Sequence, residues 1–412
     1  MKKTKLIIGF VLIGIGMFIA QPFSCAEQDQ NELSLSQLLE MFQRTITIIQ
    51  EYYVEVPDVN KMMTGAINGL LRGLDPHCSY ISRKERKNFE EDFSGEFFGI
   101  GISYDIIDGI LTIISPIKNS PAEKAGIRPG DQIIKIDDEV IIGESKENII
   151  DMLTGPSGSK VFITILRKEE EILYNIERSK IEVTSIPYSY FLNDSTGYIR
   201  ISTFTEKTGE ELGECLNQLF NREMKQLVLD LRSNTGGILS QAIETADYFL
   251  NPDQEIVTTK GRTLDNIKRY RGNSEKTIPL IPVIILIDHG SASASEIVAG
   301  ALQDWDRALI AGLRSFGKGL VQQEFPIGYG ASILLTIEKY YTPSGRLIQR
   351  DYSQGYYDYY MESLEDSIYN KEVSDSFYTK GKRKVFGGGG ITPDYKINWY
   401  DYNEEIEKII YH

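Results

Sequence analysis

The serine-rich turn at residues 290–296 and the glycine-flanked Lys318 are the segments of this 412-residue chain that have the chemistry for acyl transfer. Ser293 precedes a predicted helix, which leaves the N–H of Ala294 among the unpaired donors where negative charge is favoured. A hydroxyl nucleophile and an oxyanion donor would thus lie side by side. The same turn is also a capping box, in which Ser293 caps the helix and Glu296 reaches back.

An acyl-transfer site also needs a general base and a second oxyanion donor. Histidine is scarce, since the chain has only His77, His289 and the terminal His412. A serine-histidine-aspartate triad is therefore disfavoured, although His289 stays an alternative because it is close to the serine turn. Lysine serves as a base when burial keeps its amine neutral. Lys318 is the candidate, and Gln322, four residues on, would share its face and orient the amine.

The segments around these residues predict a mostly parallel sheet. Two strand–turn–helix units, residues 226–250 and 282–305, each begin with a continuous apolar strand. Such strands, with helices between them, are typical of buried parallel strands joined by crossovers. Ligands bind beyond the carboxyl ends of such strands, where both turns would lie. Further strands are expected at residues 307–313 and 332–343.

Residues 95–168 predict a small barrel with two helices that resembles a PDZ domain. Strands are expected at 98–106, 110–116, 132–137 and 160–168, and helices at 121–126 and 145–153. The resemblance rests on the segments 99–102, 120–126 and 128–134. In the first, the backbone N–H groups of Gly99, Ile100, Gly101 and Ile102 would converge on a peptide carboxylate beside an open strand edge. The alternative is a glycine hairpin in an ordinary barrel.

The combined pattern resembles the C-terminal processing peptidase family, also called tail-specific proteases, over essentially the whole mature chain. The matching segments, in chain order, are residues 74–77, the PDZ-like segment, 197–201, 229–237, 290–304, 315–322, 341–346 and 390–394. The resemblance implies that Ser293 is the nucleophile, that Lys318 is the base and that Gln322 is its orienting partner.

The resemblance also implies an oxyanion hole made by the backbone N–H of Ala294 and that of Gly236 or Gly237. Thr235 stands where the family usually has proline, which would loosen this turn without removing its donors. His77 is expected to be a packed or capping residue, and no catalytic effect is expected from Cys78, which replaces a serine of the family pattern.

The first 26 residues predict a targeting segment. A basic start is followed by the 15-residue apolar run Leu6–Ala20, shorter than the roughly 20 residues of a comfortable membrane span. Export to a periplasm or cell envelope is therefore expected. The alternatives are cleavage after Ala26, an uncleaved anchor, and a lipid on Cys25. A disulfide between Cys78 and Cys215 is neither implied nor excluded.

The chain is therefore predicted to be a multi-domain α/β protein. Its parts are a signal peptide or anchor (1–26), a helical region (30–93) with a hairpin at 33–73, a PDZ domain (94–170), and a crotonase-like catalytic core (171–412) with a charged, Tyr-rich insertion at about 351–384. The net charge of −15 disfavours nucleic acid and anionic lipid as partners.

The predicted function is a serine endopeptidase that binds the apolar C-terminal ends of exported proteins through its PDZ domain. No metal or other cofactor is expected. The alternatives are a catalytically silent PDZ scaffold and an acyl-CoA enzyme of the crotonase type. An adaptor and a second copy of the chain, joined through the 33–73 hairpin, are further candidate partners.

Overall fold

The computed structural model describes residues 33–86, 95–107, 109–263, 265–273, 277–353, 355, 359 and 375–397. The predicted leader at residues 1–26, His412 and most of the Tyr-rich insertion lie outside these residues. The chain divides into two compact units, Met1–Gly65 and Ala66–His412.

Two helices form on either side of the predicted break near Pro57, namely α1 (Leu35–Tyr52) and α2 (Val59–Arg72). Ser34 begins α1 with a capping box, in which its N–H donates to Gln37 Oε1 at 2.8 Å. No residue of α1 is buried, so its apolar side chains Leu38, Leu39 and Phe42 are exposed. None of the described helices is both long and apolar enough to cross a membrane.

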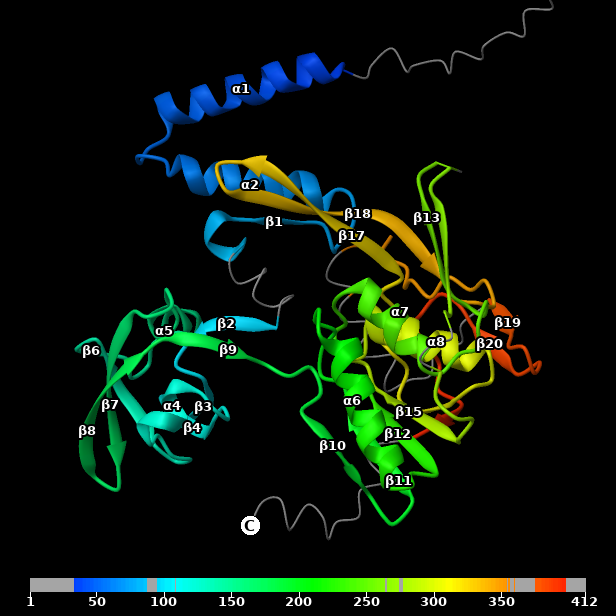
Figure 1. The fold of residues 1–412 in the computed structure, drawn as a ribbon. Helices are drawn as coiled ribbons and strands as arrows, with labels where there is room; N and C mark the ends of the chain where they lie inside the picture. The colour runs from blue at the N-terminus through cyan, green and yellow to red at the C-terminus, as the bar shows by residue number, and fades with distance from the viewer. Residues whose placement is uncertain are drawn as a thin grey trace, which may run out of the picture. The chain divides into compact units, whose positions relative to one another are not determined.

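The strands and helices predicted for residues 95–168 are all present (Figure 1). They are β2 (Glu96–Gly99), β3 (Ile102–Ile107), β4 (Ile110–Pro116), α4 (Pro121–Ala125), β5 (Gln132–Ile136), β6 (Glu139–Val140), α5 (Lys146–Leu153) and β7 (Lys160–Arg167). The first predicted strand is broken at residues 100–101. The antiparallel sheet has the order β3-β4-β5-β7-β8, which leaves β3 at an edge.

This sheet extends past the boundary at residue 170 that the sequence suggested. β8 (Glu170–Glu177) pairs with β7 along its whole length, and β9 (Ser179–Glu182) pairs with β2 in a separate two-stranded sheet. The turn between β7 and β8 places Lys168 and Glu169 at φ values of 49° and 70°. Such hairpin turns usually contain glycine or asparagine, so Lys168 and Glu169 carry no turn signal.

The residues after the PDZ-like sheet form the predicted parallel sheet, in the order β10-β11-β12-β15-β16-β21. Its strands are β10 (Tyr188–Phe191), β11 (Thr196–Arg200), β12 (Gln226–Asp230), β15 (Val283–Ile287), β16 (Leu309–Gly312) and β21 (Tyr395–Lys396). Every pairing from β11 to β21 is parallel. The helices are α6 (Thr208–Asn221), α7 (Leu239–Asp247) and α8 (Ala294–Asp304), and every residue of α8 is buried.

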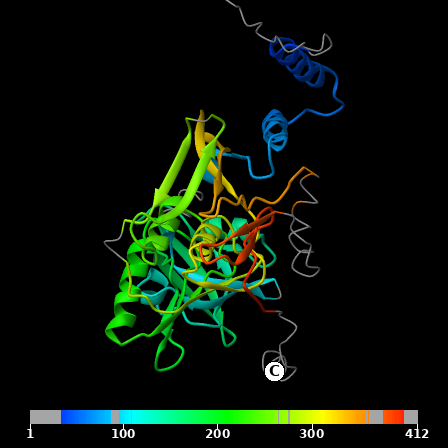
Figure 2. The ribbon, with the colours of Figure 1, turned by 90° about the vertical axis from the view of Figure 1, so that its right-hand side faces the viewer.

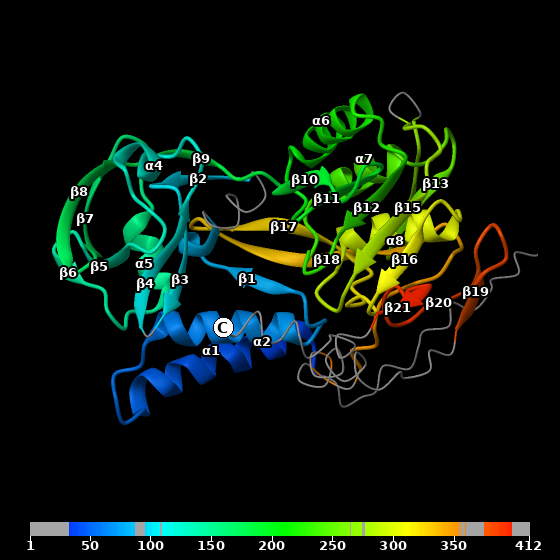
Figure 3. The same ribbon diagram turned by 90° about the horizontal axis from the view of Figure 1, so that it is seen from below.

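A second sheet, of which the sequence predicted only one strand, carries part of the site. It has the order β1-β18-β13-β14, with β17 paired to β18. The strands are β1 (Ser79–Ile81), β13 (Glu255–Gly261), β14 (Ile267–Arg271), β17 (Leu320–Gly328) and β18 (Ala331–Tyr341). Figure 2 shows β13 beside β18, and Figure 3 shows β1 beside the β17–β18 hairpin. β19 (Ser376–Tyr378), near the end of the predicted insertion, pairs with β20 (Lys384–Phe386), which follows it.

Candidate active site

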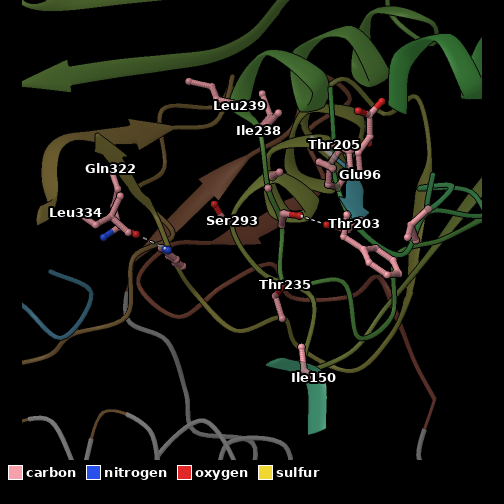
Figure 4. A pocket seen from close by; sticks show the side chains of 18 of the residues that line it. Glu96, Ile150, Thr203, Thr205, Thr235, Ile238, Leu239, Ser293, Gln322 and Leu334 are labelled. Carbon is pink, nitrogen blue, oxygen red and sulfur yellow. Dashed lines mark hydrogen bonds between the residues drawn. The ribbon is translucent and has the colours of Figure 1, made fainter. Parts of the chain in front are cut away.

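One cavity of about 1180 Å³ is lined by every predicted site residue. They are Gly99, Ile100, Gly101, Ile102, Gly236, Gly237, Ser293, Ala294, Lys318 and Gln322. Figure 4 shows Ser293 in this cavity, with Gln322 on one side and Thr203 and Thr235 on the other. The alternative base, His289, is exposed and does not line the cavity. No cluster suited to a metal ion occurs in the described part of the chain.

Ser293 lies at the start of α8 in a strained backbone conformation, with φ 54° and ψ −111°. A positive φ at a non-glycine residue costs of the order of 1–3 kcal/mol and is common at functional sites. Glu296 reaches back as predicted, since its Oε2 accepts from Ser293 N at 2.9 Å. Glu296 N donates to the Ser293 carbonyl at 2.9 Å and closes the capping box with Ser293 as the acceptor, so no described residue takes the hydroxyl proton. The hydroxyl therefore stays available to the cavity.

Gly236 and Gly237 are required because their turn packs closely against Ser293 and Phe204. Gly236 and Gly237 have φ values of 107° and 139°. A Cβ on Gly236 would lie 2.8 Å from Ser293 Cβ, and one on Gly237 would lie 2.2 Å from the carbonyl oxygen of Phe204. Only glycine accepts both the backbone conformation and the contact.

Asn234, which the sequence analysis did not single out, holds this turn. Its Oδ1 accepts from Gly236 N at 2.9 Å, and its Nδ2 donates to the carbonyl of Ile201 at 2.9 Å. The Asn234 carbonyl accepts from Ala292 N at 3.0 Å, which joins the glycine turn to the serine turn. An asparagine that bonds the N–H two residues on is a known turn signal. Thr235, which stands where the family usually has proline, is exposed, and the turn is held by the hydrogen bonds of Asn234.

The bond to Asn234 removes one of the predicted oxyanion donors. Because Gly236 N already donates to a buried side chain, its N–H is occupied, and Gly236 is corrected to a structural residue of the turn. The N–H groups of Gly237 and Ala294 donate to no residue in the part of the chain that the structure describes. These two remain the candidates for an oxyanion hole.

Lys318 presents a largely buried amine to the cavity. Its Nζ donates to Gln322 Oε1 at 2.7 Å, as the four-residue spacing predicted. Burial lowers the pKa of Lys318 below its usual range, while the charges of Asp75 and Glu296 oppose that shift. Among the described residues Lys318 makes no hydrogen bond to Ser293. Catalytic hydrogen bonds often form only once substrate is bound.

Gln322 is oriented by a second bond that the sequence did not reveal. Its Nε2 donates to the carbonyl of His77 at 2.7 Å, which turns the amide oxygen toward Lys318. Asp75 holds this carbonyl in place, because its Oδ1 accepts from His77 N and Cys78 N at 2.8 and 2.9 Å. The turn at 75–78 is therefore structural, as expected, but it supports Gln322 directly.

The His77 ring is packed, as the sequence analysis expected. Its Nε2 lies 2.8 Å from Tyr359 Oη. Burial, and then the charge of Lys318, lowers the pKa of His77 to about 4. The ring is thus neutral at ordinary pH. Cys78 and Cys215 are both free thiols, so the disulfide left open by the sequence is not formed.

The glycine loop of the PDZ-like sheet is anchored through the cap of α4. Ser120 Oγ donates to the Gly101 carbonyl at 3.0 Å, and a Cβ on Gly101 would lie 2.4 Å from Ser120 Cβ. The loop leads into the edge strand β3, and Ile150 and Leu153 of α5 line the same cavity. The side chain of Ile100 is buried in the domain core, so only its backbone can meet a ligand.

Family models match two parts of the chain. The model of peptidase family S41 matches residues 195–355, and that of the PDZ domain matches residues 112–167. The carboxy-terminal-processing protease of Bartonella bacilliformis is 38% identical over 355 residues, which cover 84% of this chain and 80% of that protein. The carboxy-terminal processing protease CtpB of Bacillus subtilis is 36% identical over 317 residues, covering 76% of this chain and 66% of that protein.

Among solved structures, a photosystem II D1 C-terminal processing protease aligns over 91% of this chain and 96% of its own, with a TM-score of 0.46 and 23% identity. The sequence relationship to the Bartonella bacilliformis protease carries the assignment, because it covers 84% of this chain and 80% of that protein. The chain belongs to the carboxy-terminal processing proteases, the serine-type peptidases of family S41, and carries a PDZ domain.

Proposed function

We propose that this peptidase captures the apolar C-terminal ends of exported proteins in its PDZ groove and cleaves them with a Ser293–Lys318 pair. The observation that carries the proposal is the shared cavity, in which the predicted peptide-binding loop, the Ser293 hydroxyl and the largely buried amine of Lys318 line one space. A scaffold would need the loop alone.

In the proposed reaction, Ser293 Oγ attacks the carbonyl carbon of the scissile bond while neutral Lys318 takes the hydroxyl proton. The oxygen becomes negatively charged and is held by the N–H groups of Gly237 and Ala294. The C–N bond then breaks, and the leaving amine takes the proton from Lys318. Water next attacks the acyl-enzyme and gives a proton to Lys318. The ester C–O bond then breaks, Ser293 Oγ takes that proton back from Lys318, and the acid is released.

Gln322 acts on this reaction by fixing the amine. A lysine side chain has many rotamers, and one hydrogen bond to an oriented amide restricts them. Because Gln322 Oε1 can only accept, it bonds the protonated amine as well as the neutral one, so it holds Lys318 through the whole cycle. No metal or nucleotide is needed.

The peptide would bind as an added strand on β3, with its terminal carboxylate at residues 99–102. Among the described strands β3 pairs with β4 alone, which leaves its other edge without a strand partner in that part of the chain. Ile102, Ile150 and Leu153 line the cavity there, so an apolar last residue fits better than a charged one.

We further propose that the chain is exported by its first 26 residues to a periplasm or cell envelope, where the leader is cleaved, retained, or replaced by a lipid on Cys25. A second copy or an adaptor would bind the exposed apolar residues of α1. The net charge of −15 leaves nucleic acid out of the proposal.

The test is cleavage of an unfolded protein with an apolar C-terminus, compared between the unmodified chain and Ser293→Ala, with products identified by mass spectrometry. Loss of cleavage in the variant is expected. The matched control substrate ends in two aspartates and should be cleaved more slowly at low concentration. Binding of the peptide without any cleavage by the unmodified chain would favour the scaffold.

A further inference from the structure

Among the described residues, Glu296 is the one whose side chain bonds both the Ser293 turn and the Lys318 loop, and it is fully buried on α8. Its Oε2 accepts from Ser293 N and from Lys318 N, each at 2.9 Å. Its Oε1 accepts from Gly317 N at 2.7 Å and from Ser315 Oγ at 2.5 Å. A helix cap alone would explain only the bond to Ser293.

The four donors fit an ionised carboxylate. Three of them are backbone N–H groups, which cannot accept a hydrogen bond. Only Ser315 Oγ could receive a carboxyl proton, and its own O–H would then lose the acceptor that it has on Glu296. Burial raises the pKa of Glu296, while its hydrogen bonds oppose that rise because they favour the charged form. The charged form is therefore the one that satisfies every donor.

We propose that Glu296 is a positioning residue for peptide hydrolysis, which fixes the Ser293 turn against the Lys318 loop so that hydroxyl and amine meet. The proposal rests on the roles proposed above for Ser293 and Lys318. Since Oε2 bonds the backbone nitrogens of both residues, their separation is set by one atom. Small displacements between reacting groups reduce rates strongly.

The charge of Glu296 has a second consequence for Lys318. The charged or titratable groups that act on this amine are Asp75, Glu296 and His77, and the His77 ring is neutral above a pH of about 4. Burial lowers the pKa of Lys318, and the two carboxylates raise it. Loss of either carboxylate charge should therefore lower the pKa of Lys318 further. Activity would then persist to lower pH.

Glu296→Gln removes the charge of Glu296 and part of its clamp, by which we mean the hydrogen bonds that join the Ser293 turn to the Lys318 loop. An amide NH₂ cannot face the Ser293 and Lys318 nitrogens, because both are donors, so it must replace Oε1. There it opposes the N–H of Gly317, and that hydrogen bond is lost. The loop before Lys318 should loosen while the bond to Ser293 survives.

Two further variants separate charge from geometry. Glu296→Asp keeps the charge, but its shorter side chain cannot span both segments. Asp75→Asn removes a charge while its amide oxygen can still accept from His77 N and Cys78 N. Asp304→Asn is the matched control, since Asp304 is a buried carboxylate at the other end of α8 that bonds Arg346 instead of the catalytic segments.

The experiment measures kcat and KM against pH for the full chain and these variants. We expect kcat to fall about tenfold or more in Glu296→Gln and Glu296→Asp, with KM changed by less than about threefold. The acidic limb of the plot of kcat against pH should move down by about one pH unit in Glu296→Gln and Asp75→Asn. It should stay in place in Glu296→Asp. Asp304→Asn should keep the acidic limb of the unmodified chain.

A second readout needs no turnover. The rate at which acetic anhydride modifies Lys318, followed by mass spectrometry against pH, reports the pKa of its amine, and backbone hydrogen exchange at residues 315–318 reports the clamp. Both should change in Glu296→Gln even if Ser293→Ala shows that cleavage has another origin. The proposal is overturned if Glu296→Gln matches Asp304→Asn in kcat, in Lys318 modification and in hydrogen exchange.

Discussion

Replacement of Gln322 by leucine tests whether the rate of the reaction depends on the orientation of the Lys318 amine. Leucine nearly keeps the volume but removes both 2.7 Å bonds, one to Lys318 Nζ and one to the His77 carbonyl. A buried polar group left without a partner costs about 1–3 kcal/mol. The free energy of unfolding should therefore fall by about that amount through the His77 carbonyl alone.

The effect on rate follows from the amine. If the transition state needs Lys318 in the position that Gln322 fixes, a loss of about 1.4–2.8 kcal/mol lowers kcat by about 10- to 100-fold. KM should change little, because Gln322 bonds Lys318 and the His77 carbonyl and makes no hydrogen bond to the described residues of the loop at 99–102. The assay is steady-state cleavage of the unfolded substrate over pH, with stability followed by urea unfolding.

The matched control is Gln323→Leu, the neighbouring residue on β17, which is exposed and does not line the cavity. Gln322→Glu tests the direction of the pKa shift of Lys318, because it keeps an acceptor for the amine but places a negative charge beside it. That charge raises the pKa of Lys318, so the acidic limb of kcat/KM should move to higher pH. A Gln322→Leu protein as active as Gln323→Leu, at every pH, would refute the reasoning.

Three other outcomes are expected. Lys318→Ala should abolish turnover and leave peptide affinity of the PDZ groove within error, measured by calorimetry; retained cleavage would point to another base. Gly237→Ala should lose both activity and stability, because its Cβ would lie 2.2 Å from the Phe204 carbonyl, and normal folding with normal kcat would contradict the assigned turn. In the unmodified chain, kcat/KM should rise with pH through a single pKa below the usual lysine range, since only neutral Lys318 is a base; an inflection near the pKa of about 4 of His77 would implicate that ring instead.

The sequence predicted the parts of the site whose signals are local. Ser293 and Ala294 are adjacent, and Lys318 and Gln322 are four residues apart, so the pairs could be inferred from spacing alone. The parallel sheet was predicted because its strands are continuous apolar runs. Bringing the two pairs to one cavity needed the family resemblance, because no local signal links them.

The sequence did not predict contacts made through backbone atoms of distant segments. Gln322 bonds the carbonyl of His77 across a separation of 245 residues, and a carbonyl has no residue type that could signal this role. Glu296 was correctly placed as the residue that reaches back to its own helix. Its bonds to the Lys318 loop come from a segment 19 to 22 residues away and depend on the tertiary fold.

Burial explains why so many side chains of this site bond backbone atoms. A neutral lysine needs a site poor in water, and there each backbone N–H and carbonyl must find a partner within the protein. Asn234, Glu296 and Gln322 supply these partners for the glycine turn, the Lys318 loop and the His77 carbonyl. Among the described residues, the groups left without a partner on the cavity wall include the Gly237 and Ala294 N–H groups. These are the donors that acyl transfer needs, so the pattern of satisfied groups itself marks where the oxyanion would form.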